Sequence, residues 1–223
     1  MATTHRTRDA AAAKAAILRA AEALFAERGF AATSIRDVAE ASGTSKALIH
    51  HHFGSKDELY LAVKRAVIER HAEVQRPQLE RGTDPLEFVA GGIRTLFELY
   101  RSDPSLVRLG AWAQLDGTGA EWPGDEELWG AIVDRMREAQ EAGVIRADID
   151  ATLLITMGFA MVHHWCQFRA WRKHVLEYFP EQDEEALDDR YLEAVLAVFI
   201  RGITPAGQSE ENDPAARAGR REA

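Results

Sequence analysis

The stretch that most constrains the fold is residues 33–59, T-S-I-R-D-V-A-E-A-S-G-T-S-K-A-L-I-H-H-H-F-G-S-K-D-E-L. Ser34 begins a capping box, S-I-R-D, in which the serine hydroxyl accepts a backbone N–H and the aspartate carboxylate reaches back to the cap. Gly43 allows the positive φ of a tight turn. Ser45 is placed to cap a second short helix, and Ser55 opens a further capped helix through S-K-D-E. Short capped helices joined by such turns predict a helix-turn-helix.

The apolar residues of this stretch fall on one inner face and supply a small core: Ile35, Val38, Ala39, Ile49 and Phe53. The N-terminal end of the second motif helix then points outward, where its side chains can enter a DNA major groove: Lys46, Ala47 and His50. Residues around that end are placed to contact phosphate: Thr33, Ser34, His52 and Lys56. The alternative is a small three-helix bundle whose Lys and Arg side chains are simply solvated.

The segment before the motif, F-A-E-R-G-F-A-A-T-S at residues 25–34, adds a second signature. With it, residues 10–60 resemble the DNA-binding domain of TetR-family transcriptional regulators. The resemblance implies contacts to base edges from Arg36, Lys46, Ala47 and His50, and contacts to the DNA backbone from Thr33, Ser34, His52 and Lys56. We assign Ser45, at the start of the same helix, to the DNA-binding residues as well. His50 and His52 stand where the family usually has Tyr or another His, so phosphate binding is expected to vary with pH near neutrality.

The charge of the chain is unevenly distributed. Residues 1–56 carry eight Lys and Arg against five Asp and Glu, a net charge of +3, and the whole chain carries −9, which leaves −12 for the remainder. A mildly basic head on an acidic body is typical of a protein that meets phosphate at one end only. The overall negative charge argues against a protein that coats nucleic acid along its whole surface.

Apolar residues recur at helical spacing along nearly the whole chain, which predicts an all-α protein. Gly29 is expected to end the first helix, and Pro77 to end the fourth. The expected helices cover residues 10–28, 34–42, 45–52, 55–75, 85–101, 104–115, 125–142, 150–173 and 184–201. The Gly-rich link at residues 115–124 is expected to be a mobile loop.

These features predict three parts. Residues 1–55 form the TetR-type helix-turn-helix domain, and residues 56–202 form a helical effector-binding and dimerisation domain. This second part resembles the family's sensor domains more loosely, in its helix order and in the phrase A-G-V-I-R-A-D-I-D at residues 142–150. Residues 203–223 are expected to be a disordered tail, because Pro, Gly, Glu, Arg and Ala dominate there without a periodic apolar face.

A single cysteine, Cys166, excludes an intramolecular disulfide and a metal site built from several thiols. The longest apolar run, residues 151–162, is too short to span a bilayer, and the N-terminus lacks the apolar segment of a signal peptide. We therefore expect a cytoplasmic protein that does not enter the membrane.

Aromatic residues gather in the second part of the chain, where all five tryptophans lie beyond residue 100. Large aromatic side chains with a few polar groups are typical of a cavity for a small molecule. We expect such a cavity between residues 104–115 and 150–173, lined by Trp112, Gln114, Trp129, Phe159, His163 and Gln167. The alternative for each of these residues is ordinary core or dimer packing.

The histidines do not predict a metal site or a cofactor. His50, His51 and His52 point about 100° apart around a helix and cannot share one ion. His163 and Cys166 lie on one helix face, but no acidic ligand is supplied at matching spacing. The sequence also lacks a P-loop, a G-x-S-x-G elbow, an H-E-x-x-H motif and a dinucleotide-binding fingerprint, so an enzyme is not expected.

The family resemblance implies a homodimer formed through residues 150–173 and 184–201. Gly158 and Ala160 would permit close helix approach, and an apolar stripe continues along the last helix at Leu192, Val195, Leu196 and Phe199. The expected function is a repressor that binds double-stranded operator DNA and is released by a small-molecule effector. An activator, and a DNA-binding scaffold without an effector, remain alternatives.

Overall fold

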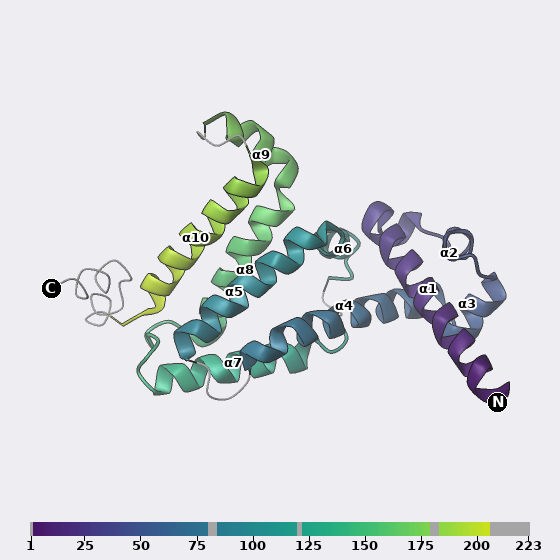
Figure 1. The fold of residues 1–223 in the computed structure, drawn as a ribbon, viewed down its shortest axis with the longest axis horizontal. Coiled ribbons are helices and arrows are strands. Elements are labelled where there is room, and N and C mark those ends of the chain that lie inside the picture. The colour runs from purple at the N-terminus through teal and green to yellow at the C-terminus, as the bar shows by residue number, and fades with distance from the viewer. Residues whose placement is uncertain (1, 80–83, 120–121, 179–182, 206–223) are drawn as a thin grey trace. The chain divides into compact units, whose positions relative to one another are not determined.

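A computed structural model describes residues 2–79, 84–119, 122–178 and 183–205 (Figure 1). All regular elements in these ranges are helices, which confirms the predicted all-α class. They are α1 (Ala2–Ala32), α2 (Ile35–Ser42), α3 (Lys46–Phe53), α4 (Lys56–Leu79), α5 (Pro85–Ser102), α6 (Pro104–Leu115), α7 (Asp125–Glu141), α8 (Ala151–Gln167), α9 (Arg169–Val175), a short 3₁₀ helix (Leu176–Tyr178) and α10 (Glu184–Ile203).

The helices pack into two compact units. The first combines residues 1–73 with residues 102–126, and the second combines residues 74–101 with residues 127–223. Helix α6 therefore groups with the N-terminal helices rather than with the helices that follow it. The compact units therefore do not coincide with the domains predicted from the sequence, whose boundaries at residues 55 and 202 stay predictions.

The core of the first unit explains why α1, α2 and α3 hold together. Helix α1 contacts both α2 and α3. Side chains that the sequence placed on inner faces are buried here: Ile17, Ala21, Phe25, Val38, Ala39, Ile49 and Phe53. Apolar residues at three- and four-residue spacing thus bury one stripe of each helix, as the helix-turn-helix interpretation requires.

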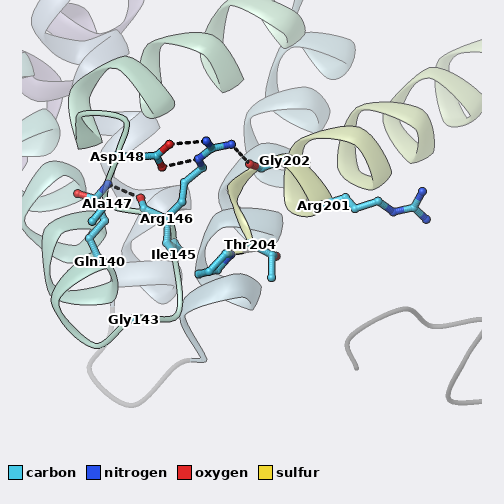
Figure 2. A pocket seen from close by; sticks show the side chains of 10 residues that line it. Gln140, Gly143, Ile145, Arg146, Ala147, Asp148, Arg201, Gly202 and Thr204 are labelled. Carbon is cyan, nitrogen blue, oxygen red and sulfur yellow. Dashed lines mark hydrogen bonds and ion pairs between the residues drawn. The ribbon is translucent and has the colours of Figure 1, made fainter. Parts of the chain in front are cut away.

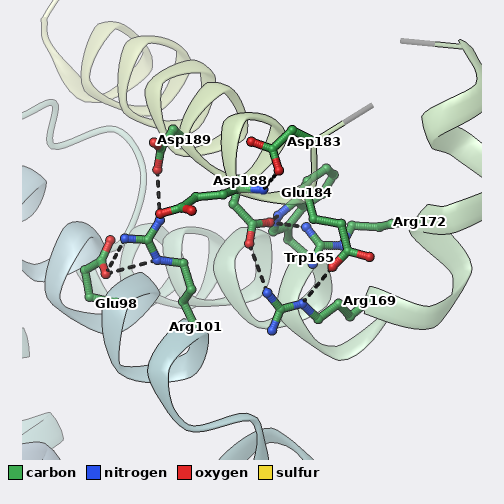
Figure 3. Close-up of polar contacts among 10 residues, drawn as sticks. Glu98, Arg101, Trp165, Arg169, Arg172, Asp183, Glu184, Asp188 and Asp189 are labelled. Atoms are coloured by element: carbon green, nitrogen blue, oxygen red, sulfur yellow. Dashed lines mark hydrogen bonds and ion pairs between the residues drawn. The ribbon is translucent and has the colours of Figure 1, made fainter. Parts of the chain in front are cut away.

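The second unit has a larger apolar core, built from α5, α7, α8 and α10. Helices α8 and α10 lie side by side (Figure 1). The ring of Phe199 fills the space left by Gly158. At one end of this pair, Asp188 of α10 is buried with Arg172 of α9, and both side chains contact Trp165 of α8 (Figure 3).

Several helix boundaries differ from the predictions. Helix α1 runs from Ala2 to Ala32 and is kinked at Gly29 instead of ending there. Helix α4 continues through Pro77 to Leu79, where the amide of Gln75 donates to the carbonyl of Gly92 at 3.3 Å and tethers this last part of the helix to α5. The single helix predicted over residues 150–173 breaks at Phe168 into α8 and α9. No Gly or Pro marks this break, so it follows from packing rather than from local sequence.

The predicted tail starts later than expected. Ile203 is still the last residue of α10, and Ile203 and Thr204 are both buried. The backbone N–H of Arg146 donates to the carbonyl of Ile203 at 2.8 Å, which holds this end of α10 against the loop after α7. The rest of the predicted tail, residues 206–223, lies outside the described residues.

Candidate DNA-binding surface

The capping box at the start of α2 forms as the sequence predicts. The hydroxyl of Ser34 accepts the backbone N–H of Asp37 at 3.2 Å, and the carboxylate of Asp37 accepts the backbone N–H of Ser34 at 2.9 Å. Hydrogen bonds from the side chain and then the backbone of Ser34 lower the pKa of Asp37 below its ordinary value. The N-terminus of α2 is therefore held rigidly at the surface, where Ser34 and Arg36 are exposed.

Thr33 is not placed as predicted. Its side chain is only 2% exposed, and its hydroxyl is within hydrogen-bonding distance of two carbonyl oxygens, that of Gly29 at 2.9 Å and that of Leu24 at 3.3 Å. A hydroxyl has one hydrogen to donate, and here that hydrogen is used inside the protein. Thr33 secures the end of α1 instead of reaching a phosphate.

The turn between α2 and α3 is set by Gly43. Its φ of 66° and ψ of 24° place it in the left-handed region, and its N–H meets the carbonyl oxygens of Ala39 and Glu40. Ser45 then caps α3 by accepting the backbone N–H of Leu48 at 3.1 Å. These two caps fix where α3 begins and hence which of its residues face outward.

Helix α3 divides cleanly into a buried face and an exposed face. Ile49 and Phe53 are buried against α1 and α2, whereas Lys46, Ala47 and His50 are exposed. Residues three and four positions apart share a helix face, so His50 lies on the same side as the other two exposed residues. This face, defined here as the reading face, carries three of the residues predicted to contact base edges, and the contacts themselves stay a prediction.

The predicted phosphate contacts at the end of α3 and the start of α4 are only partly accessible. The Nζ of Lys56 lies 4.2 Å from the centre of the Phe30 ring, which holds the ammonium near the surface through a cation–π contact. His52 is half-buried and its Nε2 is buried without a hydrogen-bond partner. Both residues thus stay predicted phosphate contacts, although the Nε2 of His52 is not accessible here.

A link that sequence reasoning missed joins α6 and the loop after it to the helix-turn-helix. The ring of Trp112 lies against Gly29, and the carboxylate of Asp116 accepts the backbone N–H of Phe30 at 2.9 Å. The ammonium of Lys64, fully buried on α4, donates to the carbonyl of Thr118. The described part of the predicted mobile loop is therefore tied to the DNA-binding helices. In the sequence, only the glycine at position 29 indicated that another segment could approach the backbone here.

Three of the predicted effector residues come together in the second unit. The ring of Phe159 stacks on His163, with centroids 5.3 Å apart, and meets Trp129 edge-on at 5.7 Å. The ring of Tyr100 meets His163 edge-on at 5.7 Å. Burial lowers the pKa of His163, with a smaller contribution from His164, which favours the neutral imidazole. We call these four residues the aromatic cluster.

The other predicted effector residues lie elsewhere. Trp112 belongs to the first unit, where it covers Gly29, and Gln114 is exposed at the end of the same helix. Gln167, the last residue of α8, is also exposed. The sequence could not separate these residues from the aromatic cluster, because helical spacing does not reveal which unit a helix joins.

An open pocket of about 670 Å³ lies in the second unit between the loop after α7 and the end of α10 (Figure 2). Three of its polar side chains are already engaged: Arg146 pairs with Asp148, and the amide of Gln140 donates to the carbonyl oxygens of Arg146 and Ile149. The described residues that line it include none of the predicted effector residues.

Neither a metal site nor a membrane-spanning helix is found in the described ranges. His, Cys, Asp and Glu side chains do not gather there in a group that could hold a metal ion. Burial raises the pKa of the Cys166 thiol to about 11, so the thiol is a poor metal ligand or nucleophile. Within the same ranges, every helix is too short or too polar to cross a bilayer.

Comparison with known proteins finds both parts of one family in this chain. Residues 17–63 match the profile of the bacterial regulatory proteins of the tetR family, and residues 89–196 match that of the tetracyclin repressor-like C-terminal domain. The HTH-type transcriptional regulator RutR of Escherichia coli K12 is 30% identical over 210 residues, which cover 91% of this chain and 96% of RutR.

Two further comparisons agree. The HTH-type transcriptional repressor KstR2 of Mycolicibacterium smegmatis is 28% identical over 146 residues, which cover 62% of this chain and 70% of KstR2. The crystal structure of a TetR family transcription regulator from Marinobacter aquaeolei superposes with a TM-score of 0.70 at 23% identity, and covers 89% of this chain and 98% of that one. The chain therefore belongs to the TetR family and is a DNA-binding transcriptional regulator, not an enzyme.

Proposed function

We propose that this regulator is a homodimeric repressor that reads operator DNA with the reading face of α3 and is released by a small-molecule effector. The observation that carries the proposal is the reading face itself, with Lys46, Ala47 and His50 exposed at the capped start of the second motif helix. In a dimer, two such helices about 34–36 Å apart, or a multiple of this, would reach successive major grooves.

Two lysines test this arrangement as a matched pair. We expect Lys46→Ala to change the base preference as well as the affinity, because the side chain lies on the reading face. We expect Lys56→Ala to weaken binding to every duplex about equally and to lower the salt slope by about one, because a phosphate contact carries no base information. Selection from randomised duplexes and salt titrations measure both effects. A Lys46→Ala variant that selects an unchanged operator would contradict the placement of α3.

The proposed dimer surface consists of exposed apolar side chains on α8, α9 and α10: Leu153, Met157, Trp171 and Val198. Exposed apolar residues gathered on neighbouring helices are typical of a protein–protein interface. In the apolar stripe predicted for this purpose, Val195 and Phe199 are buried in the core of their own chain, and Leu192 and Leu196 are partly buried and pack against that core. A charge at Leu196 would therefore damage the fold itself, and Val198 is the sharper probe.

We expect Val198→Glu to convert the dimer to monomers without unfolding the chain. Val198 is 65% exposed in a single chain, so a carboxylate there is solvated in the monomer but buried without a partner in the dimer. Light scattering gives the mass, and circular dichroism checks the fold. Ala131→Glu, at an exposed position on α7, is the control that should leave the dimer intact. A dimer that survives Val198→Glu at low concentration would refute the interface.

The aromatic cluster supports an effector with a largely apolar, planar surface. Phe159 and Trp129 offer ring faces and edges, and the Nδ1 of His163 is buried without a hydrogen-bond partner, so a ligand that enters the cluster would meet an unpaired polar atom there. A ligand that binds only the folded protein raises its melting temperature, so a thermal-shift screen of small aromatic and apolar compounds tests the proposal. A coupling free energy of about 1–3 kcal/mol between effector binding and DNA binding would weaken DNA binding by roughly 5- to 150-fold.

A further inference from the structure

The chain turns sharply at Gly54, directly after α3. Gly54 has φ 76° and ψ −86°, and the backbone N–H of Ser55 donates to the carbonyl of Phe53 at 3.0 Å, which closes a γ-turn. A Cβ at position 54 would collide with the carboxylate of Glu58, which accepts the N–H of Ser55 at 2.8 Å. The turn thus requires glycine, and it aims the carbonyl of Gly54 back at the last turn of α3.

This carbonyl fixes the ring of His50. The Nδ1 of His50 lies 2.6 Å from the carbonyl oxygen of Gly54. A carbonyl oxygen only accepts hydrogen bonds, so Nδ1 carries the hydrogen. A ring turned by 180° would put a carbon atom near the same place, well inside the ~3.3–3.6 Å of a C–H···O contact. In the neutral ring, Nε2 is therefore left as an acceptor.

An acceptor on the reading face limits what His50 can recognise. Phosphate oxygens accept hydrogen bonds, as do O6 and N7 of guanine, so none of them binds a neutral ring through Nε2. The donors in the major groove are the N6 amino group of adenine and the N4 amino group of cytosine. We infer that His50 reads one of these amino groups in each half-site, a step that rests on the proposed placement of α3 in the groove.

The tautomer is tested without DNA. Long-range ¹H–¹⁵N correlation spectra of the full chain, recorded at about pH 8 where histidine rings are mostly neutral, distinguish a hydrogen on Nδ1 from one on Nε2. The signals of His50 are those absent from a His50→Gln variant. We expect the Nδ1–H pattern for His50. A spectrum dominated by the Nε2–H form would overturn the inference.

The base contact is tested by selecting operators with the wild type and with His50→Arg. Arginine only donates and pairs with guanine, so we expect one position in each half-site to change from adenine or cytosine to guanine. In the wild-type operator, that base is then replaced by an analogue that lacks only the exocyclic amino group. We expect the affinity of the wild type to fall by roughly 2- to 10-fold, as for one lost hydrogen bond, and that of His50→Phe not to fall.

The remaining outcomes separate this inference from the proposed function. His50→Arg or His50→Phe could weaken binding to every duplex equally, with an altered salt slope and an unchanged selected sequence. That result would place His50 on phosphate and overturn the base contact. If neither protein selects any duplex, the proposed function fails and the base contact fails with it. If the wild type selects an operator in which residue 50 has no effect, the proposed function stands and only this inference falls.

Discussion

Replacing Asp188 by alanine is expected to lower the free energy of unfolding by about 3–5 kcal/mol, the usual cost of leaving a buried charge without its partner. Asp188 is 3% exposed and Arg172 is 5% exposed. The carboxylate accepts from Nη1 of Arg172, from Nε1 of Trp165 at 2.8 Å and from Nη2 of Arg169 at 3.4 Å (Figure 3). Its removal leaves the guanidinium of Arg172 buried with no counter-charge.

Thermal melts check this expectation against a neighbouring carboxylate. At about 2–4 °C per kcal/mol for a chain of this size, Asp188→Ala should lower Tm by roughly 6–20 °C. Asp189 is the matched control, because its side chain is 61% exposed and its pairing with Arg101 lies at the surface (Figure 3). Such surface pairs contribute about 1 kcal/mol or less, so Asp189→Ala should change Tm little.

A double substitution distinguishes the effect of the unpaired charge on Arg172 from that of a general packing defect. Asp188→Leu with Arg172→Met removes both charges while keeping apolar volume, and should recover most of the lost stability, since buried ion pairs are often replaceable by apolar residues. If the double variant is no more stable than Asp188→Ala, the geometry of the hydrogen bonds matters more than the unpaired charge. Equal melting temperatures for Asp188→Ala and Asp189→Ala would contradict the buried pair altogether.

Gly29→Ala is expected to destabilise the first unit by about 2–6 kcal/mol, the sum of backbone strain and overpacking. Gly29 has φ 78° and ψ 173°, a conformation that is open essentially to glycine alone. A Cβ there would lie 2.7 Å from Cε3 of Trp112 and 2.9 Å from its Cδ2. The substitution therefore forces α6 away from α1.

The control for Gly29 is Gly43→Ala. Gly43 also has a positive φ, of 66°, but a Cβ there would meet nothing within 4 Å. Only strain is expected, about 1–2 kcal/mol. Chemical denaturation followed by circular dichroism measures both losses of stability, and DNA affinity measured alongside shows whether the α6 contact affects the reading face. Equal destabilisation by both variants would show that Trp112 yields easily and that its contact with Gly29 is weak.

Local sequence was sufficient for the elements of the DNA-binding surface. Ser34, Gly43 and Ser45 act through atoms within five residues of themselves, as caps and a turn. Interactions over so short a range leave a pattern in the residue order, so the motif, its buried face and its exposed face were all predictable. Thr33 was the exception, because its hydroxyl lies within hydrogen-bonding distance of two carbonyl oxygens of α1, and one of them, that of Leu24, is nine residues away.

Contacts between distant segments left no such pattern. Asp116 binds the N–H of Phe30, 86 residues away in the sequence. Asp188 binds Trp165 of α8 and Arg172 of α9, and no Gly or Pro marks the break between these two helices. The sequence showed that Trp112 and Phe159 are large and apolar, but hydrophobic burial has no preferred direction. The sequence therefore could not predict that the ring of Trp112 covers Gly29 or that the ring of Phe159 stacks on His163. The sequence by itself therefore determined the helical class and the DNA-reading motif, because caps and periodicity are local. Only the tertiary structure decided where the remaining aromatic and charged side chains meet, because their partners are chosen by packing.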